Sequence, residues 1–245
     1  MPSAAPENAP VVKWKGEVFR LIPSRFPPIN VYDGLISEDI QKEAFVIEEL
    51  TNPRIRSLKR LHPAENVDAK SDPRLQNWNL APFAYGNPDG SIFFGEDKPC
   101  LEVAVERQTA LAVSVRKRQS FMEATQQAPI GLEMRMLCTP VSGNFWDLRN
   151  VEGPPPAGWE LNLRRALGAK LPEGAQGILY KPVERPSGTC LALVTGEVLD
   201  KTLQTVHYRY VWDGEKISEL YAFDREGTCI NAGDLANPDD VVPAA

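Results

Sequence analysis

Residues 205 to 223 read TVHYRYVWDGEKISELYAF, and this stretch has the pattern of a β-hairpin. Aromatic and β-branched side chains alternate with polar ones from Thr205 to Trp212, and a similar run follows from Lys216 to Phe223. Asp213-Gly214 stands between the two runs, and two-residue hairpin turns prefer this dipeptide because glycine accepts a positive φ. We therefore expect an antiparallel sheet.

Upstream of the hairpin, short apolar runs predict further strands, and apolar residues at helical spacing predict helices. The predicted strands cover residues 17–22, 132–138, 177–180 and 190–194, and the predicted helices cover 37–50 and 159–171.

The segment from residue 87 to residue 118 is interpreted as a turn, a strand and a helix. Asn87-Pro88-Asp89-Gly90 combines residues that favour a turn, because proline presets its φ and Asx side chains bond locally. Ser91 to Phe94 then predicts a strand. A helix is expected from about Pro99 to Arg118, since proline is tolerated in a first helical turn.

The domain organisation follows from the absence of an internal repeat or a low-complexity linker. One α+β domain, with a mixed β-sheet core and flanking helices, is the simplest account. We assign residues 1–15 to a loose N-terminal tail, 16–225 to the domain and 226–245 to a C-terminal tail.

Composition and charge argue against several classes of function. The 245 residues are 42% hydrophobic, which is enough for a sizeable core. A formal net charge of −6 opposes general nucleic-acid binding, which needs a basic surface. No apolar run approaches the roughly 18 residues of a membrane span, and residues 1–10 lack the apolar core of a signal peptide. We expect a cytoplasmic protein without membrane association.

Motifs for metals and cofactors are also missing. The two histidines, His62 and His207, have no partner at zinc spacing, and there is no phosphate-binding glycine loop, dinucleotide fingerprint or hydrolase elbow. We expect neither a metal nor a cofactor, so that chemistry would depend on carboxylates, arginines, hydroxyls and aromatic rings. Four widely separated cysteines are expected to be reduced: Cys100, Cys138, Cys190 and Cys229.

Glu106 is the most informative candidate residue. In the helix expected from Pro99, Glu102 would lie one turn before it, and the rest of that helix is apolar on nearly every side. A carboxylate in such a helix has two interpretations. It is either a residue at the edge of a buried helix, paired with an arginine such as Arg107, or a site carboxylate that faces a cleft.

Several fragments resemble, in the same order, sequences of the RES-domain family. Ile92-Phe93-Phe94, followed about a dozen residues later by Glu106, is similar to the family's aromatic strand and its helical glutamate. The other matching fragments are RLIPSRFPPI (20–29), LTNPRIR (50–56), WDLR (146–149), ALG (166–168), GILY (177–180) and HYRYVWDG (207–214).

The resemblance implies a fold related to ADP-ribosyltransferases and a toxin that pairs with an antitoxin protein. It also implies that NAD⁺ is a substrate whose nicotinamide–ribose bond is broken by phosphorolysis or hydrolysis. Glu106 would stabilise the ribosyl cation, while Phe93 or Phe94 would pack against nicotinamide. Arg20, Arg54 or Arg56 would hold the pyrophosphate, and Tyr85 is either an active-site aromatic or a packing residue. The sequence is compatible with a monomer and with a homo-oligomer.

The sequence departs from the family at other positions. Members usually carry an arginine about ten residues before the aromatic strand, but this chain has none between Asn77 and Phe94. The family's serine after the GILY-like strand falls at Pro182, and the arginine that follows it falls at Glu184. These departures support an alternative function: a degenerate, catalytically inactive RES domain that binds a nucleotide or a protein.

Overall fold

The computed structural model describes residues 6–24, 82–83, 87, 89–224 and 226–242 of the 245-residue chain. The helix expected over 37–50 lies outside these residues, and so do Arg54, Arg56 and Tyr85. Within them, the fold is α+β, as expected from the sequence.

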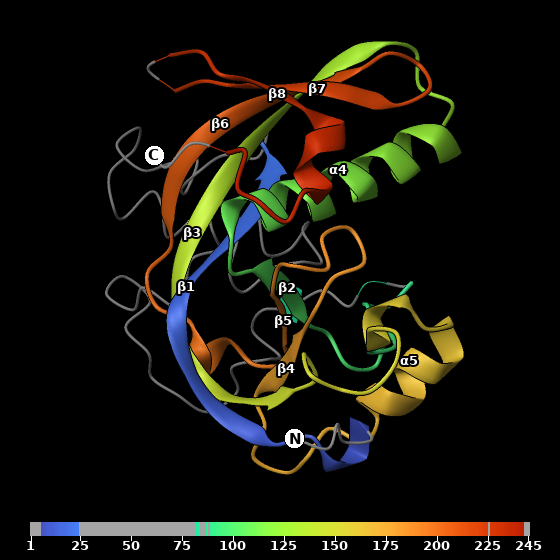
Figure 1. Ribbon diagram of the computed structural model, residues 1–245, viewed down its shortest axis with the longest axis vertical. Helices are drawn as coiled ribbons and strands as arrows, with labels where there is room; N and C mark the ends of the chain where they lie inside the picture. The colour runs from blue at the N-terminus through green and yellow to red at the C-terminus, as the bar shows by residue number, and fades with distance from the viewer. Residues whose placement is uncertain (1–5, 25–81, 84–86, 88, 225, 243–245) are drawn as a thin grey trace, which may run out of the picture.

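The described strands form one mixed sheet in the order β1-β2-β5-β4-β3-β6-β7-β8 (Figure 1). Only β3 and β4 pair in parallel; the other pairs are antiparallel. The strands are β1 (Val11–Pro23), β2 (Leu101–Ala104), β3 (Ile130–Asp147), β4 (Gly177–Tyr180), β5 (Cys190–Leu193), β6 (Leu203–Trp212), β7 (Ile217–Ala222) and β8 (Cys229–Asn231). The longer helices are α4 (Arg107–Ala124) and α5 (Leu161–Gly168), and the 3₁₀ turns are η1 (Pro6–Asn8), η3 (Pro156–Gly158), η4 (Gly196–Val198) and η5 (Ala232–Ala236).

Five of the strands close into a ring. β1 pairs with β3 along its whole length, from Val11 opposite Trp146 to Pro23 opposite Met134. Because β1 also pairs with β2, the path β1-β2-β5-β4-β3 returns to β1. Figure 1 shows β1 and β3 curving together along one side, with β2, β5 and β4 across from them.

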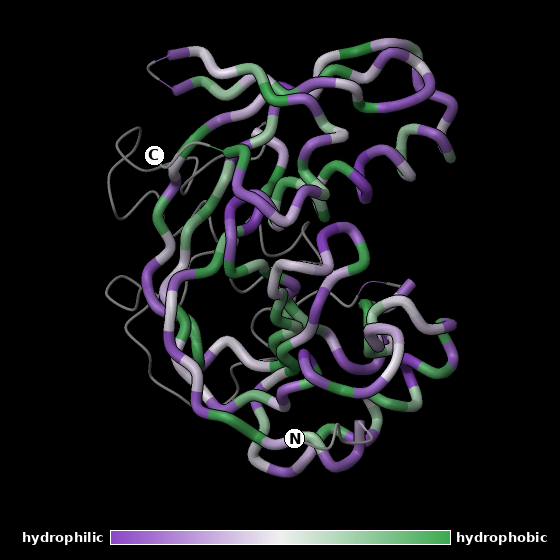
Figure 2. Tube along the Cα trace, viewed as in Figure 1, coloured by the Kyte–Doolittle hydropathy of each residue, from purple (hydrophilic) through white to green (hydrophobic). Residues whose placement is uncertain are grey.

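The inside of this ring is apolar, because alternate residues of each strand point inward. Leu101 and Val103 of β2 share one buried cluster with Leu191 and Leu193 of β5 and with Phe145 of β3. Ala104, Cys190 and Ala192, which lie next to these residues on the same strands and point the opposite way, belong to a second cluster outside the ring. The part of β5 at the centre of Figure 2 is accordingly coloured as hydrophobic.

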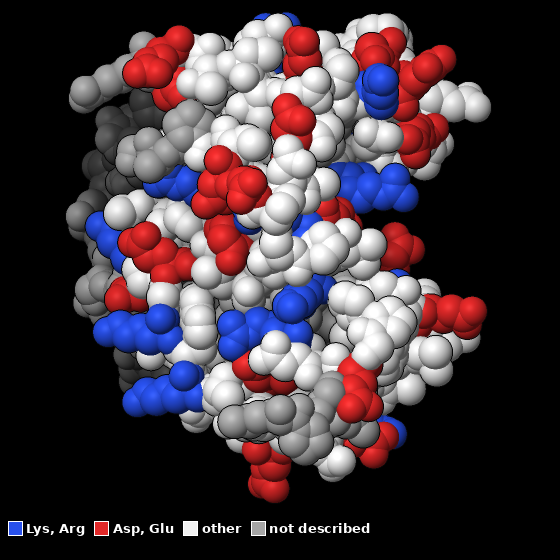
Figure 3. Space-filling view, viewed as in Figure 1, with Lys and Arg blue, Asp and Glu red and all other residues white. Residues whose placement is uncertain are grey.

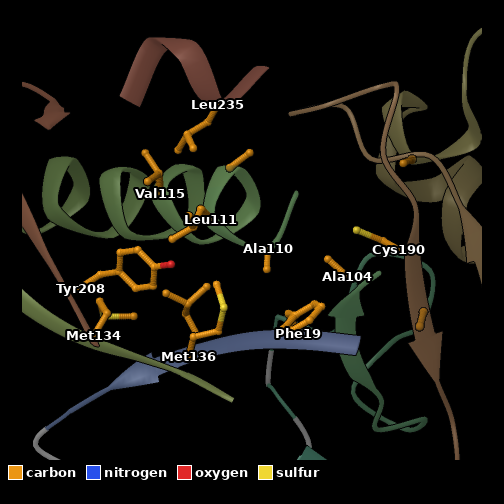
Figure 4. Packing of buried hydrophobic residues seen from close by; sticks show 14 of the residues in the cluster. Phe19, Ala104, Ala110, Leu111, Val115, Met134, Met136, Cys190, Tyr208 and Leu235 are labelled. Carbon is orange, nitrogen blue, oxygen red and sulfur yellow. The ribbon is translucent and has the colours of Figure 1, made fainter. Parts of the chain in front are cut away.

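The second cluster joins α4 to the sheet. Figure 4 shows Ala110, Leu111 and Val115 of α4 above Met134 and Met136 of β3. Tyr208 of β6 also packs there, and Leu235 of η5 covers α4 from the opposite side. α4 therefore lies between the extended sheet and η5. Among the described helices, none has the length and apolar character needed to cross a membrane.

Two sequence-based predictions near α4 are wrong. Residues 91–94 do not form a strand, because the Ser91 amide donates to the Phe94 carbonyl oxygen and closes a turn. The helix does not begin near Pro99: residues 101–104 form β2, which pairs with β5, and α4 begins at Arg107. Glu102 and Glu106 therefore do not stack along one helix, since Glu102 lies on a strand and Glu106 precedes α4.

The expected tails also differ from the structure. Residues 11–15 begin β1 and pair with β3, and residues 229–236 form β8 and η5. The predicted hairpin is confirmed: β6 and β7 are antiparallel, and Gly214 between them has a φ of 106°. β4, β5 and α5 agree with the predicted segments to within three residues at each end, whereas β3 continues nine residues beyond the predicted end at Cys138.

Candidate functional site

Glu106 lies at the point where β2 leads into α4. Its Oε2 accepts a hydrogen bond from the Thr109 hydroxyl at 2.8 Å and another from the Thr189 amide at 2.9 Å. A carboxylate near a helix N-terminus is also favoured by the helix dipole. Within the described part of the chain, Oε1 accepts no hydrogen bond, so the carboxylate is held by one oxygen and presents the other.

The loop between β4 and β5 approaches this carboxylate closely at Gly188. A Cβ atom at residue 188 would lie 2.1 Å from Thr109 Oγ1 and 3.1 Å from Glu106 Oε2. Only glycine fits at that distance from the start of α4. The same loop carries Arg185, whose Nη1 donates to Thr109 Oγ1 at 3.1 Å. Arg185, Thr109 and Glu106 thus form one hydrogen-bonded chain.

Arg149 supplies positive charge within electrostatic range of Glu106. Its Nε and Nη2 donate to the two carboxylate oxygens of Asp147, at 2.8 and 2.6 Å. Hydrogen bonding to Asp147 raises the pKa of Arg149 against the effect of burial, and the charges of Asp147 and Glu106 raise it further. This two-pronged contact fixes the guanidinium plane.

A second polar cluster lies between β2 and α4, around Glu102. Glu102 Oε1 accepts a hydrogen bond from the Ile92 amide at 2.8 Å, and Oε2 forms an ion pair with Lys117 of α4. Burial opposes ionisation, but Lys117, the Ile92 amide and Arg20 outweigh it and hold the pKa of Glu102 below its usual value. Arg20 of β1 is half-buried, and its desolvation lowers its pKa to about 10 despite the charge of Glu102.

This second cluster borders a pocket of about 360 Å³. Arg20, Lys98 and Lys117 contribute three positive charges to its lining, and Glu102 contributes one negative charge. Lys117 and Glu102 offset each other as an ion pair, so Arg20 and Lys98 leave the lining with an excess of positive charge. Its chemistry suits an anionic ligand.

Phe93 and Phe94 lie in the core. Phe93 is fully buried and meets the Tyr180 ring edge-on, with the ring centroids 5.1 Å apart. Phe94 is 3% exposed, and Lys98 Nζ lies 5.1 Å from its ring centroid. Both line an open pocket of about 770 Å³ together with Arg165 and Gly168. Their role in binding a substrate stays a prediction.

Gly168 explains one of the short sequence motifs, Ala166-Leu167-Gly168. A Cβ atom at residue 168 would lie 2.0 Å from the Phe93 carbonyl oxygen, so glycine is needed for α5 to approach this turn. Arg164 and Arg165 of α5 hold the same segment, through hydrogen bonds to the carbonyl oxygens of Ile92 and Asp89. The motif is thus explained by packing.

The candidate residues proposed from the sequence have different neighbours in the structure. Glu106 lies beside Thr109 and Thr189, whereas Arg20 is coupled to Glu102. Sequence reasoning missed Arg149 and Arg185 as charged neighbours of Glu106. Arg149 belongs to WDLR, which the sequence marks only as a fragment similar to the RES-domain family. No pattern in the sequence singles out Arg185.

The surface and the cysteines add two further observations. On the face in Figure 3, basic and acidic side chains lie interspersed, and a notch with charged side chains of both signs on its rim separates the part with α4 from the part with α5. The four cysteines are unpaired, with Cys138 and Cys190 buried and Cys229 exposed. No group of three or more metal-ligating side chains occurs among the described residues.

Two comparisons bear on the identity of the chain. A family model described as the RES domain matches residues 69–213. The chain is also 54% identical over 226 residues to the uncharacterized protein y4oC of Sinorhizobium fredii, and this match covers 92% of the chain and 96% of that protein.

Proposed function

Because the chain belongs to the RES domain family, we propose that it is a family member that lacks the catalytic residues and acts by binding an anionic ligand, such as a nucleotide. The main support for this proposal is the ion pair between Glu102 of β2 and Lys117 of α4.

The position of the strand before α4 changes how the chain is compared with its family. The resemblance places an aromatic residue of the family on a strand and its glutamate on a helix about a dozen residues later. In this structure β2 is the strand that leads into α4, and Glu102 is its residue in contact with α4. Ten residues before Glu102, where the resemblance places an arginine, lies Ile92.

If Glu102 of β2 is aligned with the family's strand residue, α4 carries no carboxylate at the position of the family's helical glutamate. A dozen residues after Glu102 lies Ser114, which is buried and accepts a hydrogen bond from the Tyr210 hydroxyl at 3.1 Å. From Arg107 to Met122, α4 contains no aspartate or glutamate. Glu106 precedes the helix, where its carboxylate joins Thr109 to Thr189.

The charge of the pocket also favours the binding of an anion over cleavage of a nicotinamide–ribose bond. Cleavage of a nicotinamide–ribose bond develops positive charge on the ribose, which a fixed, available carboxylate would stabilise. Here three cationic side chains surround one carboxylate whose oxygens are both engaged. Such a pocket stabilises phosphate groups and disfavours a ribosyl cation.

Nicotinamide release from NAD⁺ by the purified chain, with and without phosphate, tests this proposal. We expect no release above the blank, together with a rise in melting temperature on adding NAD⁺ or ADP-ribose. Lys117→Met should reduce that rise, whereas Lys170→Met, at an exposed lysine outside the pocket, should not. Turnover by the wild type that is lost in Glu102→Gln or Glu106→Gln would contradict the proposal.

A second candidate function is NAD⁺ cleavage at Glu106 by a toxin that pairs with an antitoxin. Two observations favour it: Oε1 of Glu106 lacks a hydrogen bond from the described residues, and Arg149 lies within its electrostatic range. In the same assay, release that is lost in Glu106→Gln and retained in Glu102→Gln would select this function. Growth arrest on expression without a partner would then identify the toxin.

A further inference from the structure

Residues 235–241, which we call the strap, cross the N-terminal end of α4. Leu235 is 1% exposed and packs on α4, as Figure 4 shows, whereas residues 237–241 are exposed. Apolar burial therefore fixes the strap at its start, and polar contacts hold the remainder.

Gln108 of α4 provides the first set of these contacts. The side chain is 1% exposed, and its Nε2 lies 3.1 to 3.2 Å from three strap carbonyl oxygens, those of Leu235, Asn237 and Asp239. Its Oε1 accepts a hydrogen bond from the Val241 amide at 2.7 Å. Gln108 thus uses both ends of its amide on the strap backbone.

Arg185 provides the second set from the loop between β4 and β5. It is 3% exposed, and its Nε donates to the Asn237 carbonyl oxygen at 3.0 Å. Its Nη2 donates to the Pro238 carbonyl oxygen and to Asp240 Oδ1, both at 2.9 Å. One buried guanidinium therefore contacts the backbone and a carboxylate of the same segment.

Together, Gln108 and Arg185 form a cradle that recognises a chain by its backbone and its charge. Contacts to main-chain groups select a segment by the course of its backbone, and here that backbone curls, because the carbonyl oxygens of Leu235, Asn237 and Asp239 all face one nitrogen atom of Gln108. The two side chains would be costly to bury without partners, so the cradle must be filled. Because the strap side chains from 237 onward are exposed, another segment with the same backbone and an acidic residue would satisfy the same groups.

We propose that the Gln108–Arg185 cradle is a binding site for an acidic peptide segment of another protein chain that curls as the strap does, and that the strap fills it within the free chain. Asp240 on Arg185, with Asp239 beside it, defines the charge of the segment that fits. This inference goes beyond the proposed function, and it does not depend on the pocket between β2 and α4.

Occupancy of the cradle is connected to Glu106 through Thr109. Thr109 Oγ1 accepts a hydrogen bond from Arg185 and donates one to Glu106 Oε2, which also binds the Thr189 amide. The amide of Thr189 therefore reports on a site that the peptide itself does not touch.

Binding of a labelled peptide with the sequence DLANPDDVV, residues 234–242, tests the proposal in the full-length chain. The strap of the wild type competes at the high local concentration of a tethered segment. A strap variant, Asp240→Ala with Val241→Pro, weakens this competition and leaves the cradle intact. We expect the variant to bind the peptide at least about tenfold more tightly than the wild type does.

Two controls distinguish a cradle that binds peptides from a cradle that only anchors the strap of its own chain. Adding Arg185→Met to the strap variant should abolish binding, and a peptide with lysine in place of its third aspartate, the counterpart of Asp240, should bind at least about tenfold more weakly. No binding to the strap variant, or binding that survives Arg185→Met, would overturn the proposal. If the strap variant does not fold, saturating peptide should still accelerate hydrogen exchange of the wild-type Val241 amide and shift the Thr189 amide resonance; unchanged exchange would equally overturn it.

Discussion

The interior of the ring and the N-terminal end of α4 are both buried, but different forces hold them together. Phe145, Leu179 and Leu191 inside the ring are fully buried among apolar neighbours. At the start of α4, Gln108 and Arg185 are almost as buried, yet their partners are polar. Apolar packing is non-directional and maintains a fold, whereas hydrogen bonds position particular groups and can be exchanged for equivalent ones.

The largest effect is expected inside the ring, for Phe145→Ala. Removing a fully buried phenylalanine leaves a cavity and should lower the free energy of unfolding by about 3–5 kcal/mol. Urea denaturation measures this change. Phe223→Ala, at a position 58% exposed, is the matched control and should change stability by less than about 0.5 kcal/mol. Equal losses would show that the ring interior is not the main apolar core.

A smaller loss is expected at the α4 end, for Gln108→Leu. This change keeps the side chain similar in size but removes the hydrogen bonds to the strap, so that stability should fall by about 1–3 kcal/mol. The exposed Gln127→Leu serves as the control and should be near neutral. If Gln108→Leu were as damaging as Phe145→Ala, the distinction between the two regions would fail.

Stability should also depend on pH through Glu102, which lies between the two regions. Its pKa in the folded protein is lowered from about 4.5, so its stabilising contribution is complete above that pH and is lost as the pH falls through the folded pKa. Unfolding in urea at a near-neutral and at an acidic pH measures the loss. Lys117→Met should make the loss smaller by about 1 kcal/mol. An identical pH dependence in the variant would assign the effect to other carboxylates.

The smallest effect is expected for Asp240→Asn. Asp240 is 71% exposed, so its ion pair with Arg185 should contribute no more than about 0.5 kcal/mol, and less at high salt. Thermal unfolding at low and high salt checks this. A loss as large as that of Gln108→Leu would mean that the carboxylate, and not the backbone, holds the strap.

The sequence predicts the regular parts of this fold better than its junctions. Asp213-Gly214 identifies the hairpin because its turn chemistry is local, and GILY predicts β4 because Pro182 limits this apolar run to the length of a strand. LEVA, in contrast, is a short apolar run that fits a helix or a strand equally well. Pairing with β5, some 90 residues later in the chain, decides for a strand and moves the start of α4 to Arg107.

The candidate site is predicted less well because it depends on contacts between distant segments. Glu106 was selected as a helical residue, but its geometry depends on Thr189, which is 83 positions away. Arg185 lies in an irregular loop, and its partners at 237–240 follow more than 50 positions later. Neither relationship leaves a periodic pattern in the sequence.

The pairing of β1 with β3 has a consequence for how the protein is made. The two strands are more than 100 residues apart in sequence, and β3 also pairs with β4 and β6. During synthesis β1 leaves the ribosome long before its partner exists, so its paired edge stays open until most of the chain has emerged. Folding dominated by such distant pairing is slow, and we expect the nascent chain to depend on chaperones until β3 arrives.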